Sequence, residues 1–231
     1  MLKLGADTAV ASSHVRLLGV DISLDLSVDR HVSRVCAGRF YRLRQLQRIR
    51  RSLDTDSLAT LIYAVVNSRM DYCITVLTGA PRTVTDKLQR VLNAAARVIT
   101  GTRKFDRGLV QILHDQLHWF DVPDRVLFKL AVTVHQCLNG RAPPCLSEHC
   151  VPVSNADTRR HLRSANRHLV AVPRFRLNTC GRWAFSVADP MAWNSLTDFI
   201  RDPTSSTDCF RRLLKTYLFA RYHCIQHIRG S

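Results

Sequence analysis

Apolar and polar residues alternate in segment 20–26, whose apolar positions are Val20, Ile22, Leu24 and Leu26. A period of two residues is typical of a strand with one buried face, so we expect a half-buried strand here. Gly19 directly precedes this segment, and a glycine allows a bend or a close approach of the backbone. We therefore expect a bend or close backbone approach at Gly19, directly before this strand.

From Asp29 onward the apolar spacing becomes that of an amphipathic helix, with Asp29 as its expected N-cap. Arg39 and Arg50 fall within the apolar stripe, so we expect their charged ends to reach solvent or to mark a bend. The stripe itself consists of Val32, Val35, Cys36, Phe40, Leu43, Leu46 and Ile49.

The same periodicity predicts further helices downstream. One starts near Asp54 or Thr55 and ends at Gly79-Ala80-Pro81. Another covers about 83–100, with Gly101 at its C′ position. A short helix at 109–113 precedes a longer one at 123–138, which Asp121 caps and Gly140 closes.

The sequence Ala142-Pro143-Pro144 interrupts the helical pattern and is the expected domain boundary. Beyond it we expect short strands at 168–172 and 183–187 and an amphipathic helix at 205–221. The predicted fold is mainly α: a helical bundle preceded by a short β-hairpin and followed by a smaller α+β C-terminal region. The three predicted segments are 1–28, 29–141 and 142–231.

Positive charge exceeds negative charge by a wide margin. The chain has 34 Lys and Arg residues against 18 Asp and Glu, a formal net charge of +16. Most of these cations are arginines, whose planar guanidinium pairs with phosphate through two hydrogen bonds. Such a balance indicates a polyanionic partner, either nucleic acid or an anionic membrane surface.

No apolar run approaches the roughly 20 residues that span a bilayer, and the N-terminal residues lack the apolar core of a signal peptide. The eight cysteines are scattered and show no paired framework. We therefore expect no membrane partner and a nuclear or cytoplasmic protein that is not secreted.

The first arginine-rich segment, 30–51, contains eight arginines and no acidic residue. Five of them lie opposite the apolar stripe on a helical wheel, where they could follow a phosphate backbone. A solvated helix face is the alternative interpretation. The predicted nucleic-acid-binding residues of this face are Arg30, Arg34, Arg44, Arg48 and Arg51.

A second arginine-rich segment, 159–182, is also free of acidic residues. It interleaves His161, His168 and Phe175, whose rings could stack on bases. A basic loop without a specific ligand is the alternative. The predicted binding residues here are Arg159, Arg160, Arg163, Arg167, Arg174 and Arg176, with Arg182 in the same cluster.

Catalytic and metal motifs are not evident in the sequence. The histidines and cysteines at 135–150 have the spacing Cys-x₇-Cys-x₃-His-Cys, which fits no common structural zinc pattern. Asp54 and Asp56 favour a helix N-terminus over a metal pair. We find no convergent carboxylates for a two-metal polymerase site, so the sequence predicts no catalytic residue, no metal site and no cofactor.

Several strings, in order along residues 14–220, resemble the C-terminal part of reverse transcriptases from non-LTR retrotransposons of the jockey and chicken-repeat type. SRMDYC at 68–73 resembles the family's SRLDYC, and LQRVLNAAAR at 88–97 resembles LQRVQNAAAR. The other matching strings are VRLLGV at 15–20 with His31, LHW at 117–119 with Phe128 and Lys129, LRS at 162–164, VPR at 172–174, AFSVA at 184–188, WNSL at 193–196 and FRRLLKTYLF at 210–219.

This resemblance implies that Leu18, Gly19 and Val20 form a hairpin beside the primer terminus. It implies that 29–141 is a thumb-like domain that holds the template–primer duplex. The magnesium-binding carboxylates would belong to a palm upstream of this chain. The expected function is sequence-independent binding of an RNA–DNA hybrid or DNA, without a polymerase site of its own. The rest of the reverse transcriptase would be a further partner if the protein is longer. A retained or relic protein-interaction module without enzymatic activity is the alternative.

Overall fold

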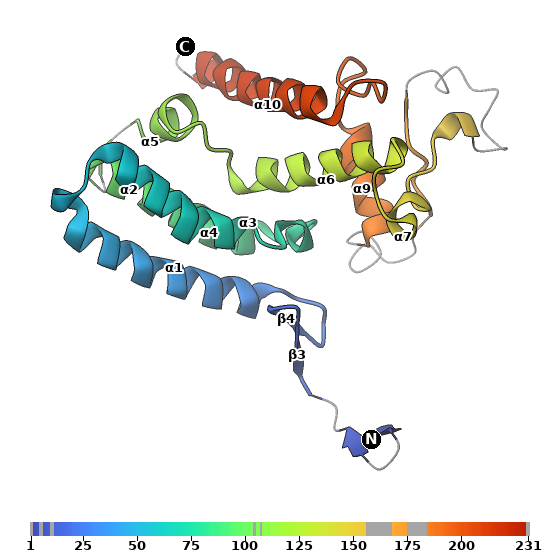
Figure 1. The fold of residues 1–231 in the computed structure, drawn as a ribbon, viewed down its shortest axis with the longest axis horizontal. Helices are drawn as coiled ribbons and strands as arrows, with labels where there is room; N and C mark the ends of the chain where they lie inside the picture. Colours follow the sequence, from blue (N-terminus) through green and yellow to red (C-terminus); the bar gives the residue numbers. More distant parts are fainter. Residues whose placement is uncertain are drawn as a thin grey trace. The chain divides into compact units, whose positions relative to one another are not determined.

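The computed structural model of the chain describes residues 2–4, 7–9, 12–103, 105–106, 108–155, 168–174 and 184–229. These residues are mainly helical and begin with short antiparallel β-hairpins, which confirms the predicted fold class (Figure 1). Two compact units are present. Unit 1 comprises Met1–Cys73 and Ala80–Asp106, and unit 2 comprises Ile74–Gly79 and Arg107–Ser231.

This division falls at Asp106, upstream of the boundary that the sequence suggested at 141/142. The reason is the packing of α6 (Val122–Leu138), which contacts α7 (Pro144–Ser147), α9 (Phe185–Asn194) and α10 (Thr207–Arg229). The prolines at 143 and 144 end a helix, but the chain folds back onto that helix and shares its core.

Unit 1 begins with β1 (Leu2–Leu4) paired to β2 (Asp7–Ala9), followed by β3 (His14–Leu17) paired to β4 (Val20–Ser23). In the second hairpin Leu17 pairs with Val20, which leaves Leu18 and Gly19 as a two-residue turn. Their φ angles are 47° and 83°, the left-handed values that a type I′ turn requires. The bend predicted at Gly19 is therefore confirmed.

The alternation at 20–26 overestimated the length of the strand. β4 ends at Ser23, and Leu24 is 83% exposed where a buried position was expected. The reason is a turn in which the amide of Leu26 donates to the carbonyl of Ser23 and the φ of Leu26 is 61°. The side chain that is buried in this strand besides Val20 is Asp21, which the pattern had placed on the polar face.

The helix α1 (Asp29–Ile49) begins where predicted, but the expected N-cap role of Asp29 is wrong. Val28 occupies the N-cap position, and Asp29 lies in the first turn, where a negative charge is favourable. Its carboxylate accepts a hydrogen bond from Nζ of Lys87 at 2.7 Å. The charge therefore connects α1 to a second helix instead of capping α1.

The next helix starts at Thr55, and the side chain of Asp54 accepts from the amide of Ser57, as an N-cap does. It runs through α2 (Thr55–Ile62), a π-helical segment (Tyr63–Asn67) and α3 (Ser68–Asp71). It therefore ends before the predicted Gly79 stop, and a 3₁₀ turn (Ile74–Leu77) follows.

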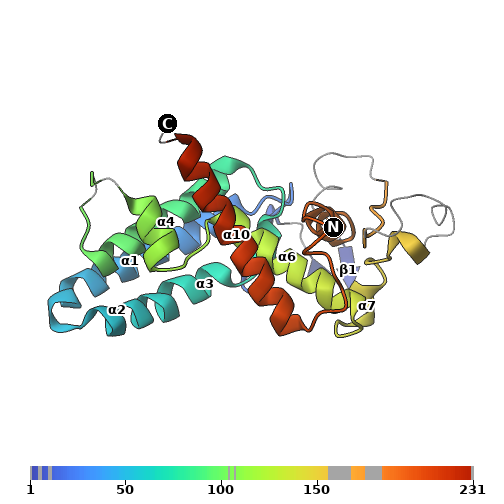
Figure 2. The same ribbon diagram turned by 90° about the horizontal axis from the view of Figure 1, so that it is seen from above.

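The helix α4 (Arg82–Thr100) completes unit 1, and its apolar stripe is buried as predicted. Gly101 follows it with a φ of 78°, and its amide donates to the carbonyl of Arg97, which confirms the expected C′ position. In both ribbon views α4 lies beside α1 (Figures 1 and 2).

Unit 2 packs α6, α9 and α10 around one core, and short elements precede α6: α5 (Leu109–Gln111) and a π-helical segment (Ile112–Gln116). His135 of α6 stacks on Phe210 of α10, with ring centroids 4.3 Å apart. Trp193 of α9 contacts the same phenyl ring and donates from its indole nitrogen to the carbonyl of His168 at 2.7 Å. Aromatic side chains therefore join all three helices.

Among the described residues of the C-terminal region, the expected strands are not observed. Segment 183–187 was predicted as a strand, but α9 begins at Phe185, so that prediction is wrong. Segment 168–172 contains a single bridge, between Val170 and Pro152, beside a short 3₁₀ turn (Val153–Asn155). A pattern of five residues is too short to distinguish a strand from a helix. The helix α9 carries Trp193, whose side chain is buried in the core of unit 2.

Asp189 of α9 is fully buried, and neither of its carboxylate oxygens has a hydrogen-bond partner among the described residues. Burial raises the pKa of Asp189 to about 7. The unfolded chain ionises this carboxyl near its usual pKa of 3.8, so the unfolded state binds fewer protons than the native state between these values. Stability is therefore lost as the pH rises from about 4 to 7.

We expect Asp189→Asn to raise the thermal unfolding midpoint at pH 8 by about 3–8 °C, because it removes an ionisable group from the core. At pH 4, where the carboxyl is protonated in the folded chain, the gain should be much smaller. Thermal scans followed by circular dichroism measure both values. Asp208→Asn, at an exposed position of α10, is the matched control. An equal gain at both pH values would contradict this assignment.

Candidate nucleic-acid interface

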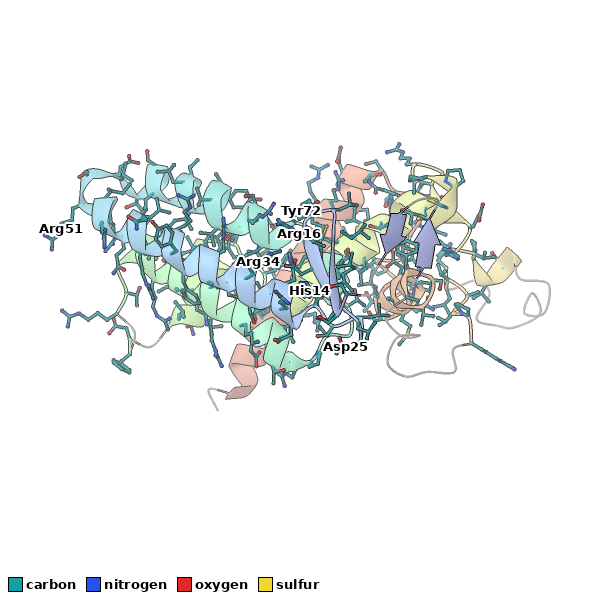
Figure 3. All side chains as sticks on the ribbon, turned by 90° about the horizontal axis from the view of Figure 1, so that it is seen from below. His14, Arg16, Asp25, Arg34, Arg51 and Tyr72 are labelled. Atoms are coloured by element: carbon teal, nitrogen blue, oxygen red, sulfur yellow. The ribbon has the colours of Figure 1, made fainter. Side chains whose placement is uncertain are left out.

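The arginines predicted on the outer face of α1 and of the turn after it are all exposed. They lie away from the buried residues Val32, Cys36 and Leu43. Figure 3 shows Arg34 beside the β3–β4 hairpin and Arg51 extending from the other end of the helix. The predicted exposure is thus confirmed for Arg30, Arg34, Arg44, Arg48 and Arg51.

Two of these arginines contact the hairpin. The guanidinium of Arg34 forms an ion pair with the buried carboxylate of Asp21, and Arg30 donates to Nδ1 of His14 at 3.2 Å. Segment 30–51 contains no acid, but the hairpin supplies one. Because Asp21 already neutralises Arg34, that arginine is less available to a phosphate than the sequence suggested.

His31 lies next to the same carboxylate and helps to fix the hairpin on α1. Its Nδ1 accepts a hydrogen bond from the amide of Asp21 at 3.4 Å and lies 3.7 Å from the Asp21 carboxylate. Burial lowers the pKa of His31, although the Asp21 charge acts in the opposite direction. The ring therefore serves as a neutral acceptor and adds no positive charge to the surface at pH 7.

The two arginines within the apolar stripe bind backbone carbonyls. Arg39 donates to the carbonyl of Val65, and Arg50 donates to the carbonyl of Ile99 at 3.4 Å. Arg50 also marks the point at which α1 gives way to a 3₁₀ turn (Arg50–Ser52). The carbonyls at a helix C-terminus have no partner inside the helix and attract cations, so Arg50 stabilises the end of α4.

Two contacts show that α1 and α4 run in the same direction. Near their N-termini, Lys87 of α4 bonds to Asp29 and also donates to the hydroxyl of Ser33 at 3.1 Å. Near their C-termini, Arg50 contacts the carbonyl of Ile99. The C-terminal halves of the two helices therefore lie side by side, and the positive charges of both come together there.

A groove of about 780 Å³ lies between these C-terminal halves, and we call it the α1–α4 groove. Arginines from both helices line it: Arg44, Arg50, Arg90, Arg97 and Arg103. Neutral polar side chains line it as well: Gln47, Asn93 and Thr102. Its apolar lining consists of Phe40, Leu43, Ala94 and Val98, and no acidic side chain is among the described residues that form it.

The groove combines uncompensated positive charge with an apolar base. Leu43 and Val98 are buried and form its deeper part, whereas Arg44, Arg90 and Arg103 are exposed. Arg50 already uses part of its guanidinium on Ile99. The Nε of Arg97 is buried and has no hydrogen-bond partner among the described residues.

Sequence reasoning identified Arg44 but missed the arginines of α4. The segment around them contains Asp86, so it does not stand out as an acid-free run. A signal was nevertheless present, because Arg90 and Arg97 are seven residues apart and share one helix face with Asn93 and Ala94. What the sequence could not show is that this face lies beside the one that carries Arg44.

The other predicted residues lie elsewhere or cannot be placed. Leu18, at the tip of the hairpin, is 81% exposed, and its carbonyl accepts from the hydroxyl of Tyr72 at 2.8 Å. Val20 is buried, and Gly19 forms the turn. Arg174 is exposed. The remaining members of the second arginine-rich segment lie outside the described residues: Arg159, Arg160, Arg163, Arg167, Arg176 and Arg182.

Within the described part of the chain, no three His, Cys, Asp or Glu side chains are arranged to hold a metal ion. His135 and Cys137, considered above for zinc, are both buried in the core of unit 2.

None of the described helices combines the length and the apolar character needed to cross a bilayer.

Comparisons of the chain with models of protein families, with curated proteins and with solved structures found no match.

Two glycines offer a test of how the groove is built. Gly101 has a left-handed conformation, and a Cβ there would overlap the guanidinium of Arg50. We therefore expect Gly101→Ala to lower the free energy of unfolding by about 1–2 kcal/mol. Gly38 lies inside α1 with open space around its Cα, so Gly38→Ala should raise it by up to about 1 kcal/mol. Urea unfolding measures both, and equal effects would contradict the described geometry.

Proposed function

We propose that this chain binds nucleic acid without sequence preference through the arginines of unit 1, with an RNA–DNA hybrid or DNA as partner. The observation that carries the proposal is the α1–α4 groove, whose described lining includes five arginines and no acid. A guanidinium matches the geometry of a phosphate, and each neutralised phosphate releases bound counterions.

The arginines of α1 contribute unequally to this proposed surface. Arg44 lines the groove, and Arg48 and Arg51 are exposed along the same end of the helix. Arg34 lies near the other end and is engaged by Asp21. Substituting Arg34 would break its ion pair with the buried carboxylate of Asp21. We therefore expect the substitution to lower the stability of the fold more than the affinity for nucleic acid.

We propose further that the chain derives from the C-terminal part of a non-LTR retrotransposon reverse transcriptase and has no polymerase site of its own. The support for this origin is the series of ordered strings from residue 15 to residue 219, including SRMDYC at 68–73 and LQRVLNAAAR at 88–97. Magnesium would then belong to the palm of the longer enzyme, which would be a further partner.

A protein-interaction module is the second candidate. The observation that favours it is the apolar surface of the β3–β4 hairpin, where Val15, Leu17, Leu18 and Leu24 are exposed. Apolar side chains gathered on one small element are typical of a surface that another protein covers. This surface contains no arginine of the groove, so the two candidates can be tested separately.

The salt dependence of binding tests the proposed function. On duplex DNA, the log–log plot of affinity against salt should steepen by about 0.9 for each phosphate contact. We expect the triple variant Arg44→Gln, Arg48→Gln and Arg51→Gln to flatten that slope by about 1–3 and to weaken binding. Fluorescence anisotropy at increasing salt measures the slope.

The matched control removes three exposed cations of α10 in unit 2, outside the proposed surface: Arg211→Gln, Arg212→Gln and Lys215→Gln. It lowers the net charge equally but should change the slope much less. An equal change of the salt slope in both variants would mean that binding depends only on net charge, and it would contradict the proposed surface. Absence of binding to RNA or DNA at physiological salt would sink the proposal and favour the protein-interaction module.

A further inference from the structure

We infer that the α1–α4 groove holds a single strand of nucleic acid, with phosphates on the arginines and a base against Phe40. This inference rests on the proposed function and divides the surface. A hybrid or DNA duplex would contact exposed arginines such as Arg48 and Arg51, whereas the groove itself would take a single-stranded segment. Its basis is the mixed lining of the groove, because the arginines alone would suit any polyanion.

The apolar side chains of the groove have no counterpart on the outside of a duplex. A duplex presents phosphates and sugars outward and keeps its base faces stacked inside. Phe40 and Ala94, the partly exposed apolar side chains of the lining, would face charged groups if a duplex lay over the groove. A single strand exposes the faces of its bases together with its phosphates, so it can satisfy both parts of the lining.

Phe40 is the side chain placed to stack on a base. It belongs to the apolar stripe of α1 but is only partly buried, and it lines the groove. Stacking of a base on an aromatic ring contributes about 1–3 kcal/mol and is independent of base identity. The absence of sequence preference proposed above follows directly from this kind of contact.

The arginines lie on both sides of this position. Arg44 follows Phe40 by one helical turn on α1, and Arg90 and Arg97 lie two turns apart on α4. The stretch from Phe40 to Arg50 is about 15 Å long, the span of a few nucleotides. Arg103 extends the positive lining past the end of α4. A flexible strand can follow this path and present its bases to the lining, whereas a stiff duplex would contact the exposed arginines with its phosphates and keep its bases stacked inside.

Fluorescence anisotropy with the full chain tests the inference. The probes are oligo(dU) and oligo(U) of about 12 nucleotides, which differ only in the sugar, and a DNA duplex of the same length. We expect both single strands to bind at least about tenfold more tightly than the duplex. Equal affinity for the two sugars supports contacts to phosphates and base faces. A strong preference for one sugar would contradict this arrangement.

Variants separate stacking from charge. Phe40→Leu should weaken single-strand binding about fivefold or more and leave duplex binding unchanged, and Phe40→Tyr should retain the affinity. The pair Arg90→Gln and Arg103→Gln should weaken single-strand binding more than Arg82→Gln with Arg212→Gln, which removes the same charge outside the groove. Circular dichroism melts confirm that each variant is folded.

The possible failures are distinguishable. If the duplex binds as tightly as the single strands and Phe40→Leu weakens neither, the inference is wrong while the proposed nucleic-acid binding stands. If neither form of nucleic acid binds, the proposed function itself is wrong, and the inference falls with it.

Discussion

The packing of α1 against α4 is the constraint on which the proposed surface depends. Contacts near both ends fix the two helices in a parallel arrangement: Lys87 with Asp29 at the N-terminal end and Arg50 with Ile99 at the C-terminal end. The apolar face of α4 is buried along its whole length. Because the helices run in the same direction, arginines that are far apart in the sequence line one groove. An antiparallel pairing of the same helices would separate them.

Arginine has two different roles in unit 1. Arg34, Arg39 and Arg50 are bound to groups of the protein, the first to the buried Asp21 and the others to backbone carbonyls. These side chains stabilise the unit, because each places its positive charge on a buried carboxylate or on a backbone carbonyl of another element. For exposed arginines such as Arg44 and Arg90, no such contact is seen with the side chains and carbonyls of the described residues. Net charge alone therefore overstates how many cations are available to a ligand.

The sequence was sufficient for those features that depend on local pattern. Helix periodicity predicted α1 and α4, Gly101 was recognised as a C′ residue, and the outer arginines of α1 were predicted to be exposed. Predictions failed where distant contacts decide the outcome. Asp21 looked like a solvent-facing strand residue but is buried by its pairing with Arg34 and His31. Segment 183–187 has the short alternation of a strand, but α9 begins at Phe185 and buries Trp193 in the core of unit 2.

The groove itself could not be predicted, because periodicity shows the face of a helix and says nothing about its neighbour. Arg90 and Arg97 carried a readable spacing, but only the parallel packing places them beside Arg44 and Phe40. The sequence resemblance suggested nucleic acid as the class of partner. The structure shows where the arginines and the apolar side chains of the groove lie.

Hydrogen–deuterium exchange of the full chain, with and without a saturating oligo(dT) strand, tests this location most directly. The account predicts that the strand slows exchange at 40–51 and at 90–103, while α10 and the rest of unit 2 keep their rates. Protection confined to other segments, or no protection despite saturated binding, would contradict the claim that the α1–α4 groove is the nucleic-acid interface.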